Sequence, residues 1–277
     1  MRLSTSTFRA PVRYSIAGLA VAALALTACG SSSSDSDSPA AGTSLQDIKD
    51  EGVLVVGTEG TYPPFTFHEG GSGDLTGYDV EVAEAVADEL GVEVQFEETQ
   101  WDAIFAGLEA GRFDMIANQV SITPEREADY VFSEPYTLSK GVIVVNEGDS
   151  SISSFDDLEG KTTAQSLTSS WYDLAEQSGA KIENVEGWAQ AVTLLQQGRV
   201  DATINDELTF LDYENSEGGD TGLAVAATTD DEARNAFAFR SGSDDLAKAV
   251  DGALKTLRKD GTLTDISEKY FGADVSR

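Results

Sequence analysis

Two oppositely charged side chains of this sequence could bind the two ends of a small zwitterion. Arg126 ends the segment Ser121–Arg126, and a guanidinium can hold a carboxylate through two parallel hydrogen bonds. Asp206 follows Asn205 and could accept hydrogen bonds from an ammonium group. Each residue also has an ordinary structural alternative: Arg126 could pair with a neighbouring glutamate at the surface, and Asp206 could cap a helix.

A repeated pattern places both residues close to the ends of strands. Trp, Leu, Gly, Arg, Asp and Asn recur at the same offsets in residues 101–118 and 188–205. Each copy is typical of a helix, a glycine at which the helix stops, and a short apolar strand. Arg126 follows the first copy and Asp206 follows the second. Because open α/β sheets bind ligands at the carboxyl ends of their strands, we expect the two charges to face one cleft.

The alternation of helix-like and strand-like patterns predicts an α/β fold with two lobes. A helix is expected from Val80 to Leu90 with Asp79 as its N-cap, and a strand is expected over residues 236–240. The chain should cross between the lobes near Leu138 and return near Asn235, which makes a two-strand hinge. The predicted boundaries are residues 45–138 and 236–277 for lobe 1, and 139–235 for lobe 2.

Further residues could complete a binding site in this cleft. Tyr62 precedes two prolines in a rigid loop, and with Trp101 it could flank an aliphatic or sulfur-containing side chain. Trp101 could equally belong to the core, as we expect of Trp188. Thr168 and Ser169 lie in a loop that enters a helix, where free N–H groups favour a carboxylate.

The first 44 residues are typical of a leader and a tether. Three arginines precede an apolar run that ends at Leu26, and Leu26–Cys29 resembles the bacterial lipobox, in which the cysteine is lipidated. We therefore expect a signal peptide over residues 1–28 and a flexible tether over residues 29–44. The protein would then be extracytoplasmic, held by Cys29 at the outer face of the bacterial cell membrane. A plain secretory signal is the alternative.

Composition argues against several other classes of function. The formal net charge of −31 disfavours nucleic acid as a partner. His68 is the single histidine and Cys29 the single cysteine, so zinc would need carboxylates almost exclusively and a catalytic triad would depend on one ring. We expect no metal, no cofactor and no catalytic residue.

The chain resembles the extracellular solute-binding proteins of polar amino acid ABC transporters, family 3. The resemblance covers nearly the whole mature chain and rests on motifs at residues 57–65, 75–80, 101–104, 121–126, 198–201, 260–263 and 270–272. It implies a type II periplasmic binding protein fold and partnership with ABC permease subunits. It also implies that Arg126 and the Thr168 region hold the ligand α-carboxylate, that Asp206 holds the α-ammonium, and that Tyr62 and Trp101 line the side-chain pocket.

The segments Ala117–Val120, Ala164–Ser169 and Val185–Gly187 are similar to the cystine-binding branch of this family. Ala117–Val120 carries Asn118 and Gln119 where binders of basic amino acids usually have small hydroxyl residues. Gln119, Gln165, Ser169 and Asn205 could serve the second head group of L-cystine without adding charge. The expected ligand-binding residues are Tyr62, Trp101, Asn118, Gln119, Ser121, Arg126, Gln165, Thr168, Ser169 and Asp206.

Two other functions fit the same resemblance. A ligand-sensing protein could dock on a receptor in place of a permease. A dehydratase similar to cyclohexadienyl dehydratase would need an acid or base in the cleft, for which Glu59 is the best candidate. We expect a binding protein rather than an enzyme. A monomer is expected, because two lobes suffice to form the site.

Overall fold

The computed structural model describes residues 42–277. The predicted signal peptide, the lipidation residue Cys29 and most of the predicted tether lie outside this range. Thr43 is already buried, and its backbone N–H donates to Ser243 Oγ at 2.9 Å while its hydroxyl donates to Asp114 Oδ1 at 3.0 Å. The packed part of the chain therefore includes Thr43, inside the segment that the sequence assigned to the tether.

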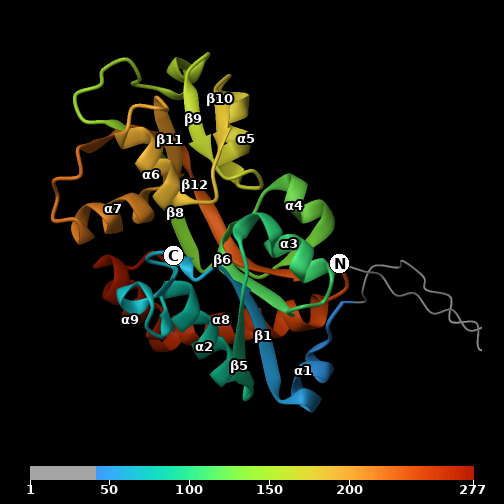
Figure 1. Ribbon diagram of the computed structural model, residues 1–277. Helices are drawn as coiled ribbons and strands as arrows, with labels where there is room; N and C mark the ends of the chain where they lie inside the picture. The colour runs from blue at the N-terminus through green and yellow to red at the C-terminus, as the bar shows by residue number, and fades with distance from the viewer. Residues whose placement is uncertain (1–41) are drawn as a thin grey trace, which may run out of the picture. The chain divides into compact units, whose positions relative to one another are not determined.

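The first lobe combines a parallel set of strands with helices on its faces (Figure 1). Its strands β1, β5 and β6 pair in parallel, with β1 in the middle. Glycine in the left-handed conformation ends helix α2 at Gly91, as the sequence predicted. The larger elements are α1 (Leu45–Glu51), β1 (Val53–Thr58), α2 (Tyr78–Leu90), β5 (Glu93–Glu98), α3 (Trp101–Glu109), β6 (Met115–Ser121), α4 (Pro124–Asp129), β7 (Tyr130–Phe132), α8 (Asp244–Asp260) and α9 (Thr262–Phe271).

A small three-stranded antiparallel sheet follows β1 and carries Tyr62. It consists of β2 (Thr61–Tyr62), β3 (Thr66–His68) and β4 (Leu75–Thr76), with the short 3₁₀ turn η1 (Glu69–Gly71) between the last two strands. A rigid loop was expected around Tyr62, and these short strands were not predicted.

The second lobe repeats the parallel arrangement. Strands β9 and β10 pair in parallel, and β9 also pairs in parallel with β11. The elements of this lobe are η2 (Phe155–Leu158), β9 (Thr162–Gln165), α5 (Ser170–Gln177), β10 (Lys181–Asn184), α6 (Trp188–Gln196), β11 (Ala202–Asp206) and α7 (Glu207–Ser216). Helix α7 continues to Ser216, into the polar, glycine-containing segment 214–221.

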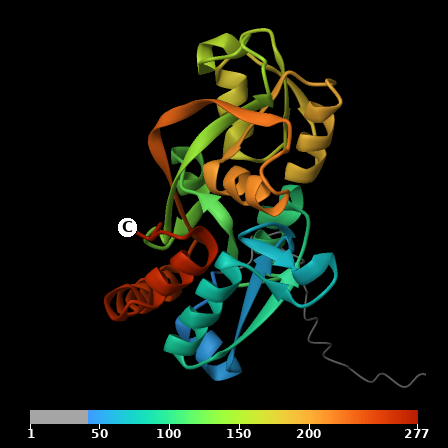
Figure 2. The ribbon, with the colours of Figure 1, turned by 90° about the vertical axis from the view of Figure 1, so that its left-hand side faces the viewer.

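Two long antiparallel strands join the lobes, β8 (Thr137–Asn146) and β12 (Leu223–Arg240), as Figure 2 shows. They give one sheet with the order β10-β9-β11-β8-β12-β6-β1-β5. The sequence prediction of a strand over 236–240 was too short, because the part of β12 before Ala236 is mostly polar or exposed. Pairing is irregular between Thr228 and Glu232, in the stretch between the lobes. The crossing points Leu138 and Asn235 stay a prediction.

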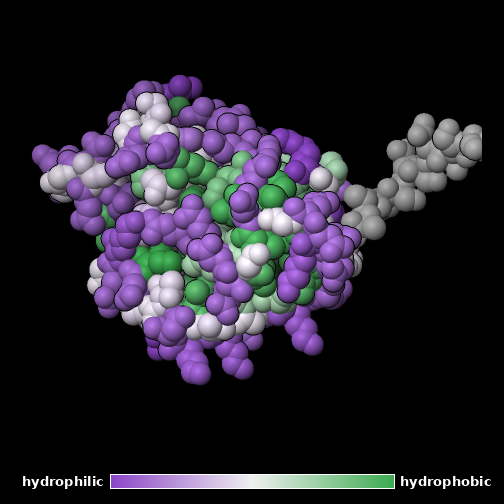
Figure 3. All heavy atoms as spheres, turned by 90° about the horizontal axis from the view of Figure 1, so that it is seen from below, coloured by the Kyte–Doolittle hydropathy of each residue, from purple (hydrophilic) through white to green (hydrophobic). Residues whose placement is uncertain are grey.

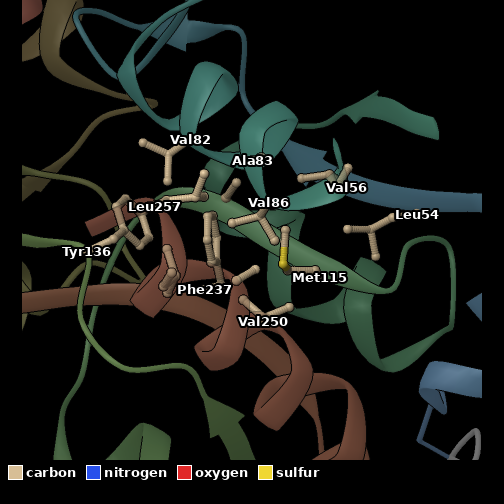
Figure 4. Close-up of a cluster of buried hydrophobic side chains, with 14 of the residues drawn as sticks. Leu54, Val56, Val82, Ala83, Val86, Met115, Tyr136, Phe237, Val250 and Leu257 are labelled. Carbon is tan, nitrogen blue, oxygen red and sulfur yellow. The ribbon is translucent and has the colours of Figure 1, made fainter. Parts of the chain in front are cut away.

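The main core of the first lobe lies between its helices and its sheet (Figure 4). Val82 and Val86 of α2, Met115 of β6 and Val250 of α8 are all fully buried there. One predicted cap is wrong: α2 begins at Tyr78 with Gly77 as its N-cap, so Asp79 lies in the first turn and is buried.

Figure 3 shows the face opposite the second lobe, where hydrophilic residues cover most of the surface and hydrophobic residues are visible in patches between them. No helix within residues 42–277 is long and apolar enough to cross a membrane.

Candidate functional site

A cleft lies between the two lobes, and most of the predicted site residues line it. From the first lobe the lining includes the predicted residues Tyr62, Trp101, Asn118, Gln119, Ser121 and Arg126. From the second lobe it includes the predicted residues Gln165 and Ser169. Thr168 and Asp206 are not part of the lining.

Arg126 lies at the start of α4 and reaches both lobes. The hydroxyl of Thr123 accepts a hydrogen bond from the Arg126 backbone N–H and fixes the first turn. Arg126 Nη1 donates to Ser121 O at 2.8 Å, and Nη2 donates to Thr168 O of the second lobe at 3.0 Å. The guanidinium carbon lies 5.2 Å from the ring centre of Phe105 and 5.6 Å from that of Trp101.

Arg126 stays positively charged at neutral pH although it is partly desolvated. Desolvation lowers the pKa of the guanidinium to about 10, which still leaves it protonated at neutral pH. No salt bridge to Arg126 is present within the described residues. A cation held beside aromatic faces without an acidic partner can therefore bind a ligand carboxylate.

The loop before α5 brings Thr168 and Ser169 to the rim of the cleft. Ser169 Oγ accepts from Tyr172 N at 3.1 Å and caps α5. The Thr168 backbone N–H and hydroxyl donate to Asp102 Oδ1 of the first lobe, at 3.2 and 3.1 Å. The predicted carboxylate donor at Thr168 is thus occupied by an interlobe contact in this arrangement.

Asp206 lies behind Gln119, not directly on the cleft. Its Oδ1 accepts from Leu208 N at 2.9 Å, so the helix-capping alternative is confirmed. Its Oδ2 accepts from Ser139 Oγ at 2.5 Å and from Gln119 Nε2 at 3.2 Å. Burial raises the pKa of Asp206 to about 6, although these three hydrogen bonds favour the charged form.

Gln119 links the two lobes and has a buried acceptor without a partner among the described residues. Its backbone is left-handed, with a φ of 49°, which no other non-glycine residue among 42–277 shares. The backbone N–H donates to Asp79, and the side-chain amide donates to Asp206. Because the amide nitrogen faces a carboxylate, Oε1 points elsewhere, and within the described residues this buried oxygen has no partner.

Glu59 supplies a carboxylate to the cleft that the sequence analysis considered only as a possible acid or base. Glu59 Oε2 accepts from Asn118 Nδ2 at 2.9 Å, and Asn118 Oδ1 accepts from Glu59 N at 2.8 Å. Burial raises the pKa of the Glu59 carboxyl group above its usual range. The position directly after β1, at a strand end, was the signal that could have identified it.

Trp188 and Asn205 line the cleft although neither is among the ten expected ligand-binding residues; Asn205 was considered only for the second head group of cystine. Trp188 was expected in the core; it does pack there, against Val192 and Tyr213, but it also lines the cleft. Asn205 accepts a hydrogen bond from Tyr62 OH at 2.7 Å, across the two lobes. Groups of three or more potential metal ligands are absent from residues 42–277.

Comparison of this chain with known proteins shows to which family it belongs. The model of bacterial extracellular solute-binding proteins, family 3, matches residues 54–273. The L-cystine-binding protein TcyA of Bacillus subtilis (strain 168) is 48% identical over 259 residues, which cover 94% of this chain and 96% of TcyA.

Two solved structures are similar to this chain over most of its length. The L-cystine solute receptor of Neisseria gonorrhoeae, in its unliganded open conformation, is 44% identical with a TM-score of 0.58, covering 85% of this chain and all of the receptor (100%). An ancestral arginine-binding protein bound to arginine is only 35% identical but has a TM-score of 0.74, covering 80% of this chain and 99% of that one. With its two α/β lobes, two-strand hinge and interlobe cleft, the chain has the type II periplasmic binding protein fold and belongs to the bacterial extracellular solute-binding proteins, family 3.

Proposed function

We propose that this protein captures L-cystine outside the cell as the substrate-binding component of an amino acid ABC importer. It would be held at the outer face of the bacterial cell membrane by a lipid on Cys29 and would deliver its ligand to membrane permease subunits. A monomer suffices for this role, because one chain supplies both walls of the cleft.

The observation that carries the proposal is the distribution of charge across the cleft. Arg126 and Glu59 line the cleft with opposite charges. Asp206 adds a second carboxyl group behind the lining residue Gln119, to which it is hydrogen-bonded. A ligand that bears both carboxylate and ammonium groups matches this pattern. Because Arg126 and Gln119 already contact the second lobe, a ligand held between them would favour the closed arrangement.

Cystine is favoured over a basic amino acid by the neutral polar groups of the lining. Gln119 Oε1 and Gln165 Nε2 provide an acceptor and a donor without partners among the described residues, and a second head group would need both. The relatives named above include two that are described as cystine-binding. Both considerations point to the same ligand.

Isothermal titration calorimetry with the purified chain tests this proposal. L-Cystine should bind, and L-arginine, L-lysine and L-glutamine should bind more weakly or not at all. Tight binding of a basic amino acid without binding of cystine would reject the ligand assignment.

The buried carboxyl group of Glu59 keeps a dehydratase as the second candidate function. A general acid needs a raised pKa and a place in the substrate cleft, and Glu59 has both. Incubation with cyclohexadienyl carboxylic acids, followed by product analysis, distinguishes the two functions. We expect no turnover.

A further inference from the structure

The N-terminus of helix α6 opens onto the cleft at a distance in sequence from every residue predicted to hold a carboxylate. Gly187 is its N-cap and has no side chain, and the first turn contains no acidic residue. Residues 185–188 and, one turn further, Ala191 all line the cleft. The first N–H groups of a helix carry partial positive charge and need an acceptor from outside the helix.

Two buried side-chain donors accompany this helix end. Gln165 is 3% exposed and Trp188 is 7% exposed, and both line the cleft. Gln165 Nε2 and Trp188 Nε1 have no hydrogen-bond partner within the described residues. Leaving such donors unpaired is costly, so each favours an acceptor that enters the cleft.

The topology brings the two donors together. Gln165 ends β9, and Trp188 begins the helix that follows the neighbouring parallel strand β10. Gln165 is paired in register with Asn184, and Gln165 O accepts from Val185 N at 3.1 Å. The carboxamide, the indole and the start of α6 therefore meet at one edge of the second lobe, while Arg126 lies on the first.

We propose that the start of α6, Gln165 and Trp188 form a second carboxylate subsite, which gives the cleft its selectivity for ligands with two carboxylates. This inference rests on the proposed function and deepens it. Arg126 holds the first carboxylate, and the neutral donors of the second lobe hold the other.

The neighbouring Glu59 supplies the negative charge that the ammonium group of an amino acid needs beside these donors. A Cβ atom on Gly187 would lie 3.9 Å from Glu59 Oε1, so a carboxylate approaches the same helix end from the first lobe. The donors of the subsite can bind the carboxylate of an amino acid group, and the neighbouring Glu59 carboxylate can bind the ammonium group of the same amino acid. The ligand class is therefore an elongated molecule with an α-amino acid group at each end.

The experiment compares L-cystine with the mixed disulfide of L-cysteine and cysteamine, which is cystine without one carboxylate. Calorimetry on the purified full-length chain should show cystine binding about ten- to a hundredfold more tightly. Trp188→Phe, which removes the indole N–H and keeps an aromatic ring, should weaken cystine about three- to tenfold and the mixed disulfide less than about twofold.

Gln165→Met supplies an independent variant of nearly equal size, with the same expected loss of selectivity. Thermal unfolding of both variants is measured alongside. Equal weakening of both ligands would indicate a merely structural role and overturn the subsite, as would a wild-type chain that binds the two disulfides equally. A wild-type chain that binds neither, but binds another amino acid, would reject cystine itself and the subsite with it.

Discussion

The ionisation of Asp206 should make ligand binding sensitive to mild acid. Burial raises the pKa of this carboxyl group from 3.8 to about 6 in the unliganded chain. If a ligand ammonium is stabilised by the charged form, protonation must weaken binding. For a group of this pKa, the dissociation constant of cystine should rise about tenfold between about pH 7 and about pH 5.

The raised pKa of Asp206 affects the stability of the fold in the opposite direction to its effect on ligand affinity. A carboxyl group whose pKa is raised in the native state binds protons more readily there than in the unfolded chain. Through Asp206, acidification from about pH 6 to about pH 4 should therefore stabilise the unliganded fold. Loss of cystine affinity combined with unchanged or higher thermal stability would separate this effect from acid unfolding.

Calorimetry at both pH values, with wild type and Asp206→Asn, measures the effect. Asparagine keeps the size and can still cap Leu208 N, but it carries no charge. The variant should bind cystine weakly, with little change between the two pH values. Glu59→Gln serves as the matched control, since Glu59 is a carboxyl group with a raised pKa that lines the cleft directly. A wild-type affinity that stays flat, or a dependence that persists in Asp206→Asn, would refute the role of Asp206.

Three further substitutions probe separate parts of the structure. Arg126→Ala should weaken cystine binding by about one to two decades in calorimetry, since it removes a charge-assisted pair of about 1.5–3 kcal/mol; unchanged affinity would place the carboxylate elsewhere. Burial raises the pKa of Asp79 to about 8, so ionisation of this carboxyl group opposes folding as the pH rises from about 5 to about 8. In Asp79→Asn the thermal stability should therefore fall less over this pH range than in wild type; an equal fall in both proteins would contradict this. Tyr62→Phe removes the 2.7 Å interlobe hydrogen bond to Asn205 and should lower cystine affinity about fivefold, with a larger unliganded radius of gyration in X-ray scattering; an identical radius and affinity would show that the bond does not hold the lobes together.

The sequence by itself determined the architecture, and eight of the ten site residues predicted from it line the cleft. The repeated helix–glycine–strand pattern, with Trp101 and Trp188 at corresponding places, specifies two similar α/β units. Periodicity and glycine placement are local properties, so they can be interpreted without coordinates. The carboxyl ends of the strands then indicate where polar residues such as Asn118 and Gln165 must gather.

Only the tertiary structure decided how these residues are connected. It turned Gln119 into a left-handed link between Asp79 and Asp206, and so moved Asp206 behind the wall of the cleft. It also brought Glu59 close to the start of α6 and left the donors of Gln165 and Trp188 without partners. These relations join residues far apart in the chain, and they depend on how the two lobes pack against each other, which no local pattern encodes.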